Sequence, residues 1–113
     1  MRAWGFLTNH AHVLIQVARN PRSTVREIAL SAGITERATH AMLKDLRDAG
    51  IVIAQRSGRQ NVYQVDPAAL AKHPRWAASD MPIPKPLIEA TLRGLVRVAS
   101  AGAAQRDSQA NQA

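Results

Sequence analysis

The sequence contains no cysteine, and only 4% of its residues are aromatic. Without cysteine, the chain cannot form disulfide bonds, use a thiolate nucleophile or sense metals through thiolates. So few aromatic side chains do not make the stacking platform on which single-strand binders hold bases. No apolar run approaches the ~20 residues of a membrane span, and the opening "MRAWGFL" lacks the apolar stretch of a secretory signal. A cytoplasmic protein without a membrane partner is therefore expected.

Acidic residues are also scarce. Eight Asp and Glu stand against 15 Lys and Arg, which gives a net charge of +7 and a pI of about 11.3. This excess favours a polyanionic partner, either nucleic acid or an anionic membrane surface. The 113 residues fit one domain, and a hydrophobic content of 46% is ample for its core. No nucleophile-elbow, P-loop or dinucleotide-binding pattern occurs, so we predict no enzymatic activity and no cofactor.

The histidines and the aromatic residues are assigned no ligand. His10 and His12 lie two residues apart in a helical pattern, where side chains diverge by roughly 200°. Helical pairs that chelate a metal need a spacing of four, so no metal site is predicted. The aromatic residues are expected to fill the core; they are Trp4, Phe6, Tyr63 and Trp76.

Apolar residues at helical spacing predict three helices, over residues 8–19, 24–33 and 35–49. Thr8, Thr24 and Thr35 stand where N-caps are needed, and Thr24 with Glu27 has the spacing of a capping box. Gly33 ends the second helix at a position suited to positive φ. The pattern then changes to that of strands, because "IVIAQ" and "NVYQV" flank the glycine-containing "RSGR" of a hairpin. This order predicts an α+β, mainly α fold, a winged helix-turn-helix domain over residues 1–66.

A proline-rich segment follows the hairpin. Five of the six prolines lie between positions 67 and 86, so residues 67–85 are predicted to form a linker with at most a short helix. An amphipathic helix is predicted over residues 86–100, followed by a disordered tail over residues 101–113. The apolar side of that helix must be buried, and a contact between two copies is favoured over packing on its own domain.

The stretch "VREIALSAGITERATHAMLK" matches the register of a helix-turn-helix. Ala29 is the small residue where the two helices touch, and Gly33 provides the turn. Ile34 and Met42 then fix the second helix against the first. Thr39 stands where Val or Ile is usual, and its hydroxyl is expected to donate to a carbonyl one turn earlier.

This register predicts an exposed polar face on the third helix, made of Thr35, Glu36, Arg37, His40, Ala41 and Lys44. A recognition helix enters the major groove by its N-terminus, so its early residues reach the bases. Arg37 suits guanine and His40 a purine acceptor, whereas Ala41 allows close approach or meets a thymine methyl. Thr35 and Lys44 suit phosphates, which position the protein without specifying sequence.

Two alternatives stay open for this face. Glu36 either accepts from a cytosine amine or only favours the helix N-terminus electrostatically. The whole face is alternatively a solvated surface that binds nothing.

The hairpin loop "RSGRQN" places Arg56, Arg59 and Gln60 at the tip of a two-stranded wing. Arginine at such a tip enters a narrow minor groove, where the negative potential is strongest. The alternative is a basic edge that only discourages strand pairing.

The chain resembles the small bacterial winged helix-turn-helix regulators of the MarR and ArsR groups. The likeness lies in "WGFLTNHAHVLIQVARNP", in "VREIALSAGITERA" and in the wing "RSGRQNVYQV", and it covers about residues 4–75. It implies sequence-specific binding of double-stranded DNA through the third helix and the wing, usually by a homodimer. It does not supply a small-molecule effector.

We therefore predict a transcriptional regulator whose recognition helix, residues 35–49, reads the major groove while the wing, residues 56–60, enters the minor groove. A two-fold dimer predicts half-sites ~10 bp apart or a multiple of that spacing. The alternative function is a winged-helix module that binds another protein and no DNA.

Overall fold

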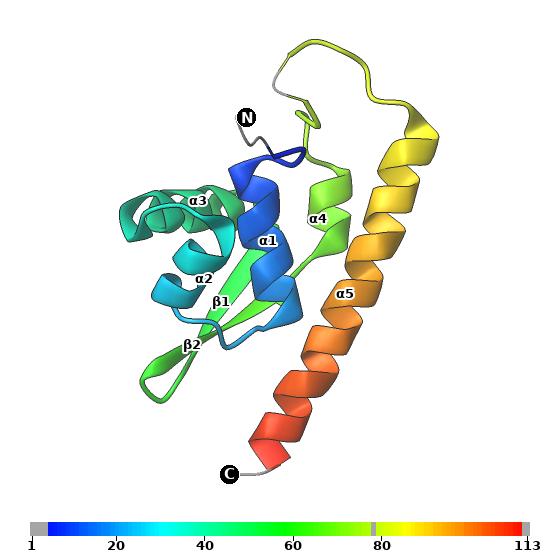
Figure 1. Ribbon diagram of the computed structural model, residues 1–113. Helices are drawn as coiled ribbons and strands as arrows, with labels where there is room; N and C mark the ends of the chain where they lie inside the picture. The colour runs from blue at the N-terminus through cyan, green and yellow to red at the C-terminus, as the bar shows by residue number, and fades with distance from the viewer. Residues whose placement is uncertain (1–4, 78, 112–113) are drawn as a thin grey trace.

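The computed structural model describes residues 5–77 and 79–111 and shows a mainly helical chain with one β-hairpin (Figure 1). Three helices precede the hairpin and two follow it. The elements are α1 (Asn9–Arg19), α2 (Val25–Ala32), α3 (Glu36–Asp48), β1 (Val52–Ser57), β2 (Gln60–Val65), α4 (Pro67–Ala71) and α5 (Lys85–Asn111). Three helices followed by an antiparallel hairpin form the winged helix that the sequence predicts.

Threonine side chains begin each of the first three helices. Thr8, Thr24 and Thr35 each accept a hydrogen bond from the backbone amide three residues later. Glu27 completes a capping box, because its carboxylate accepts from the Thr24 amide at 3.0 Å. Gly33 ends α2 with φ of 70°, a left-handed conformation that glycine adopts without a steric penalty. The predicted helix starts and the predicted turn are thus confirmed.

The hairpin is closed by a two-residue loop, since Ser57 pairs with Gln60 across it. Gly58, the first loop residue, has φ of 62°, as a type II′ turn requires at that position. The base of the hairpin is attached to the turn before α2, where the Tyr63 amide donates to the Pro21 carbonyl at 2.8 Å. This hydrogen bond therefore fixes the hairpin against the rest of the domain.

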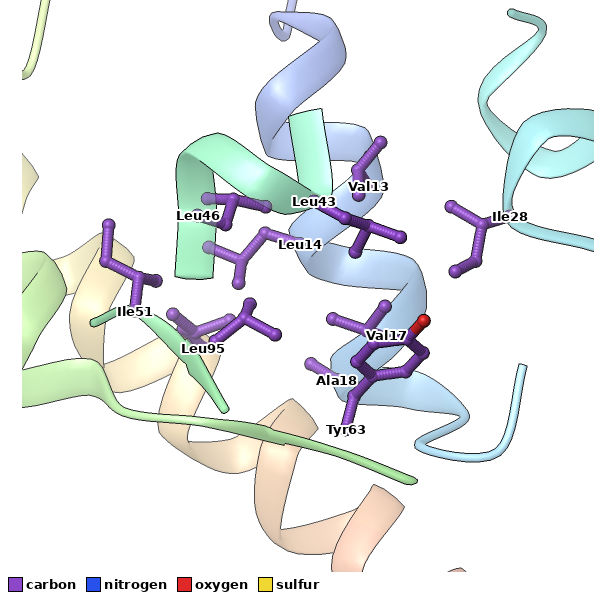
Figure 2. Close-up of a cluster of buried hydrophobic side chains, with 11 residues drawn as sticks. Val13, Leu14, Val17, Ala18, Ile28, Leu43, Leu46, Ile51, Tyr63 and Leu95 are labelled. Atoms are coloured by element: carbon purple, nitrogen blue, oxygen red, sulfur yellow. The ribbon is translucent and has the colours of Figure 1, made fainter. Parts of the chain in front are cut away.

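The hydrophobic core gathers around α1 (Figure 2). α1 supplies Val13, Leu14, Val17 and Ala18. The other elements bring Ile28, Leu43, Leu46, Ile51, Val52, Tyr63 and Leu95. Among the aromatic residues expected in the core, Tyr63 is buried and Trp76 is half-buried. Phe6 is 90% exposed, so its predicted burial is wrong, and Trp4 lies outside the described residues.

The C-terminal region differs from the sequence prediction in its extent. The linker contains α4, which Asp66 caps and Pro67 begins. The last helix, predicted over residues 86–100, runs from Lys85 to Asn111, through most of the segment predicted to be a disordered tail. Alanine, the strongest helix former, recurs after residue 100 and favours this continuation. Residues 112 and 113 lie outside the described part of the chain.

The apolar side of α5 packs against the core of the same chain. Leu95 is only 7% exposed and belongs to the core, and Val98 and Ala99 pack against it. Figure 1 shows α5 running alongside α1 and the hairpin base. The structure thus shows the stripe around Leu95 packed within the chain, and the contact between two copies stays a prediction.

Candidate nucleic-acid interface

The core sets which side of α3 is exposed. Leu43, Leu46 and Thr39 are buried, and the Thr39 hydroxyl donates to the Thr35 carbonyl at 2.9 Å. Thr39 has 0% exposure, so its hydroxyl needs this internal partner, as the sequence predicts. The departure from the usual Val or Ile is thus accommodated within α3 and leaves the register unchanged.

The opposite side of α3 presents the residues that the sequence predicts for DNA contact. Each of them is exposed: Thr35, Glu36, Arg37, His40, Ala41 and Lys44. The Thr35 side chain is engaged as the N-cap, where it accepts from the Ala38 amide at 3.0 Å. Its hydroxyl hydrogen can still be donated, because capping uses only the oxygen as an acceptor.

Lys44 is held in an ion pair on α3. Its Nζ lies 2.7 Å from Oδ2 of Asp48, one turn along the helix, and both side chains are exposed. The hydrogen bond to this carboxylate and its charge raise the pKa of Lys44 above the ordinary lysine value. A phosphate at this position must therefore compete with Asp48 for the ammonium group.

A second contact links α3 to α1. His10 Nε2 lies 2.9 Å from Oδ2 of Asp45 on the exposed surface. The two residues are 35 positions apart, so no local pattern indicates this pair. It joins the start of α1 to the second half of α3. Within the described residues, no group of three or more potential metal ligands occurs.

The wing carries the other predicted contacts. Arg56, Arg59 and Gln60 are exposed, and Arg56 Nε donates to the Gly58 carbonyl at 3.3 Å, across the loop. In Figure 1 the wing tip and α3 lie on the side of the molecule away from α5. The third helix and the basic loop therefore lie on the same side of the molecule.

Arg22 joins this surface, although the sequence does not single it out. It stands in the turn before α2, and its Nη1 donates to Oε1 of Gln60 at 3.3 Å. The two residues are separated by 38 positions, and only the folded hairpin brings them together. In the sequence, Arg22 is marked only as a basic residue that follows Pro21, and this does not predict a place beside the wing.

A helix-turn-helix with an exposed third helix and a basic wing defines the winged helix-turn-helix class of proteins. A sequence model of the MarR family matches residues 4–60, half of the chain. The chain belongs to the MarR family, whose members are typically DNA-binding transcriptional regulators. The match includes every predicted contact residue on α3 and on the wing. Searches of curated proteins and of solved structures give no match. In the described part of the chain, no helix is long and apolar enough to span a membrane.

Proposed function

We propose that this protein is a cytoplasmic, non-enzymatic transcriptional regulator that binds specific sites in double-stranded DNA. Residues 35–49 lie in the major groove, and the wing, residues 56–60, enters an adjacent minor groove. The observation that carries the proposal is the exposure of the polar residues of α3, a helix that lies on the same side of the fold as the exposed basic wing. The net charge of +7 supports a polyanionic partner.

The contacts divide into base readout and phosphate positioning. Arg37 and His40 are near the N-terminal end of α3, the end that approaches bases when a recognition helix docks. A guanidinium that donates two hydrogen bonds to guanine discriminates bases by ~1–3 kcal/mol. Lys44 lies one turn further along and contacts phosphate, once Asp48 releases it. The Thr35 hydroxyl, at the N-cap, donates to a phosphate nearby.

The regulator acts as a homodimer, and its interface uses surfaces other than the buried side of α5. Large apolar residues remain exposed where α1 and α5 begin, both at the upper end in Figure 1; they are Phe6, Leu7, Met81 and Leu87. If the dimer forms through these residues, Leu87→Glu should disrupt it. Light scattering should then show that this variant is a monomer. Val96→Glu, at an exposed apolar position later in α5, is the matched control. Dimeric Leu87→Glu would exclude this interface.

Duplex binding measured across a salt series tests the function. The duplex is selected by the protein from a random pool, and an unrelated duplex serves as the control. A protein that makes several phosphate contacts loses orders of magnitude in affinity between about 50 and 200 mM salt. It should also prefer the selected duplex at every salt concentration. A chain that binds neither duplex at low salt is not a DNA-binding regulator, and the protein-interaction module becomes the better description.

A further inference from the structure

A hollow of about 170 Å³ lies between the wing and the start of α2. Its walls come from two segments far apart in the sequence. Arg22 and Thr24 line it from the turn before α2, and Arg59, Gln60 and Asn61 line it from the wing. None of the lining residues in the described structure is acidic. Two arginines and two amide residues therefore line the hollow, and no acidic residue does.

The Arg22 side chain is held in place, but not all of its donors have hydrogen-bond partners. Its side chain is half-buried, and its Nη1 donates to Gln60 at 3.3 Å. Its Nε is buried and has no hydrogen-bond partner among the described residues. A buried donor on a cation costs free energy when it is unpaired, and charge-assisted acceptors recover the most. An anionic oxygen suits the guanidinium group, and it reaches the exposed part of this half-buried side chain rather than the buried Nε.

The two walls are fixed relative to each other by the fold. The Tyr63 amide donates to the Pro21 carbonyl at 2.8 Å, beside Arg22, and the Tyr63 side chain is 4% exposed. The Arg22–Gln60 hydrogen bond is a second connection between the same two segments, and it lies nearer the wing tip. An anion seated between the walls therefore meets an Arg22 side chain that is already held in position, which reduces the entropy lost on binding.

The N-terminus of α2 does not supply the donors of this site. The amides of Thr24 and Glu27 are satisfied within the capping box, by the Glu27 carboxylate and the Thr24 hydroxyl. The Glu27 carboxylate also opposes an anion at the helix end itself. The arginine pair, and not the helix terminus, supplies the attraction.

We propose that this hollow seats one backbone phosphate of the bound duplex, with Arg22 and Arg59 as its cationic donors. The inference rests on the proposed function and deepens it. A phosphodiester carries one negative charge and offers paired oxygen acceptors, which match the planar donor geometry of guanidinium groups. The seated phosphate lies beside the wing and fixes how far it enters the minor groove. Arg22 is thus a positioning residue for DNA binding and carries no base preference.

The first experiment compares Arg22→Ala with Arg97→Ala, a substitution of an exposed arginine on α5. Affinity for the selected duplex and for an unrelated duplex is measured over the salt series. Arg22→Ala should weaken binding to both duplexes by roughly tenfold and lower the salt slope by about one, whereas Arg97→Ala should change neither. Arg22→Gln, which keeps a polar side chain beside Gln60, repeats the measurement if Arg22→Ala fails to fold. An unchanged affinity and slope in the folded variant overturns the proposal.

The second experiment locates the phosphate. Methylphosphonate is placed at single positions of the selected duplex, which removes the charge of one phosphate at a time. Wild-type protein should lose affinity at one position per half-site where Arg22→Ala or Arg22→Gln loses none. If every position affects wild type and variant equally, Arg22 does not contact a phosphate and the proposal fails.

The same variants separate a duplex phosphate from a free anion. Inorganic phosphate without DNA is added to each protein while thermal unfolding is followed. Stabilisation of wild type but not of Arg22→Gln, without any methylphosphonate coupling, identifies a free-anion site and overturns the proposal. Wild-type protein that binds no duplex contradicts the proposed function itself, which is a different result.

Discussion

Gly102 of α5 packs directly on the backbone carbonyl of Ala18, close to the end of α1. A Cβ atom added at Gly102 would lie far inside van der Waals contact with that carbonyl. The same addition at Gly94, two turns earlier on α5, meets no described atom within 4 Å. The missing side chain at position 102 therefore sets how closely α5 approaches α1, while Leu95 anchors the helix in the core.

We expect Gly102→Ala to loosen the C-terminal half of α5 from the domain. The added methyl meets backbone rather than a flexible side chain, so the helix must shift away from α1. Gly94→Ala is the matched control and should stabilise the protein by up to ~1 kcal/mol through helix propensity. Thermal unfolding and limited proteolysis measure the two effects. Equal stability and equal protease resistance of the two variants would contradict the close contact with Ala18.

The capping box of α2 predicts a pH dependence. Hydrogen bonds from the amide and then the hydroxyl of Thr24 lower the pKa of Glu27 below 4.5. A carboxyl with a lowered folded pKa stabilises the fold above its unfolded pKa, and this contribution disappears as the pH falls through the folded pKa. Wild type should therefore be more stable than Glu27→Gln at pH 7, with the difference shrinking below pH 4.5.

Urea unfolding at a series of pH values measures this difference. Glu36→Gln is the control, because Glu36 occupies the first turn of α3 without the capping-box contact. A Glu27→Gln difference that stays constant from pH 7 to below 4.5 would show that the ionised cap contributes nothing.

The ion pair on α3 predicts that Asp48 restrains DNA binding. Asp48→Asn removes the carboxylate 2.7 Å from Lys44 Nζ and leaves the ammonium free for a phosphate. Affinity for duplexes of any sequence should rise, and the salt slope should steepen by about one. Asp80→Asn changes the net charge equally but lies in the segment before α5, so it should have a smaller effect. Binding curves over the salt series distinguish the two, and identical curves would remove Lys44 from the interface.

The sequence predicts the features of this fold that depend on neighbouring residues. Thr24 and Glu27 begin α2, Gly33 turns the chain and Gly58 closes the hairpin, each within a few positions of its partner. The side of α3 that faces outward follows from the same local register, and Thr39 meets the expected carbonyl.

Contacts between segments that are distant in the sequence could not be predicted from local patterns. The apolar stripe around Leu95 must be buried, but the stripe alone does not say whether α1 of the same chain or a second copy covers it. The Arg22–Gln60 hydrogen bond and the His10–Asp45 pair likewise need the folded hairpin and the packed helices. Phe6 shows the same limit, because an aromatic residue before the first helix is buried only if another segment covers it.

Arg37→Ala and Arg59→Ala separate base readout from positioning. Arg37 is exposed in the first turn of α3, where a recognition helix meets the bases. Its loss should reduce the preference for one base pair of the selected site, at a cost of ~1–3 kcal/mol, while binding to unrelated duplexes changes little. Arg59 lines the hollow from the wing, where the proposal places it against a phosphate of the DNA backbone. Its loss should weaken binding to all duplexes alike and lower the salt slope by about one.

Selection of preferred sequences from a random pool, repeated with each variant, reads out the base preference, and the salt series reads out the phosphate contacts. Arg93→Ala, an exposed arginine on α5, should match wild type in both measurements. If Arg37→Ala and Arg59→Ala weaken every duplex equally and leave the selected sequence unchanged, neither arginine reads a base. Specificity would then come from His40 and Ala41, or from the shape of the duplex, which a protein reads through deformation energy rather than base contacts.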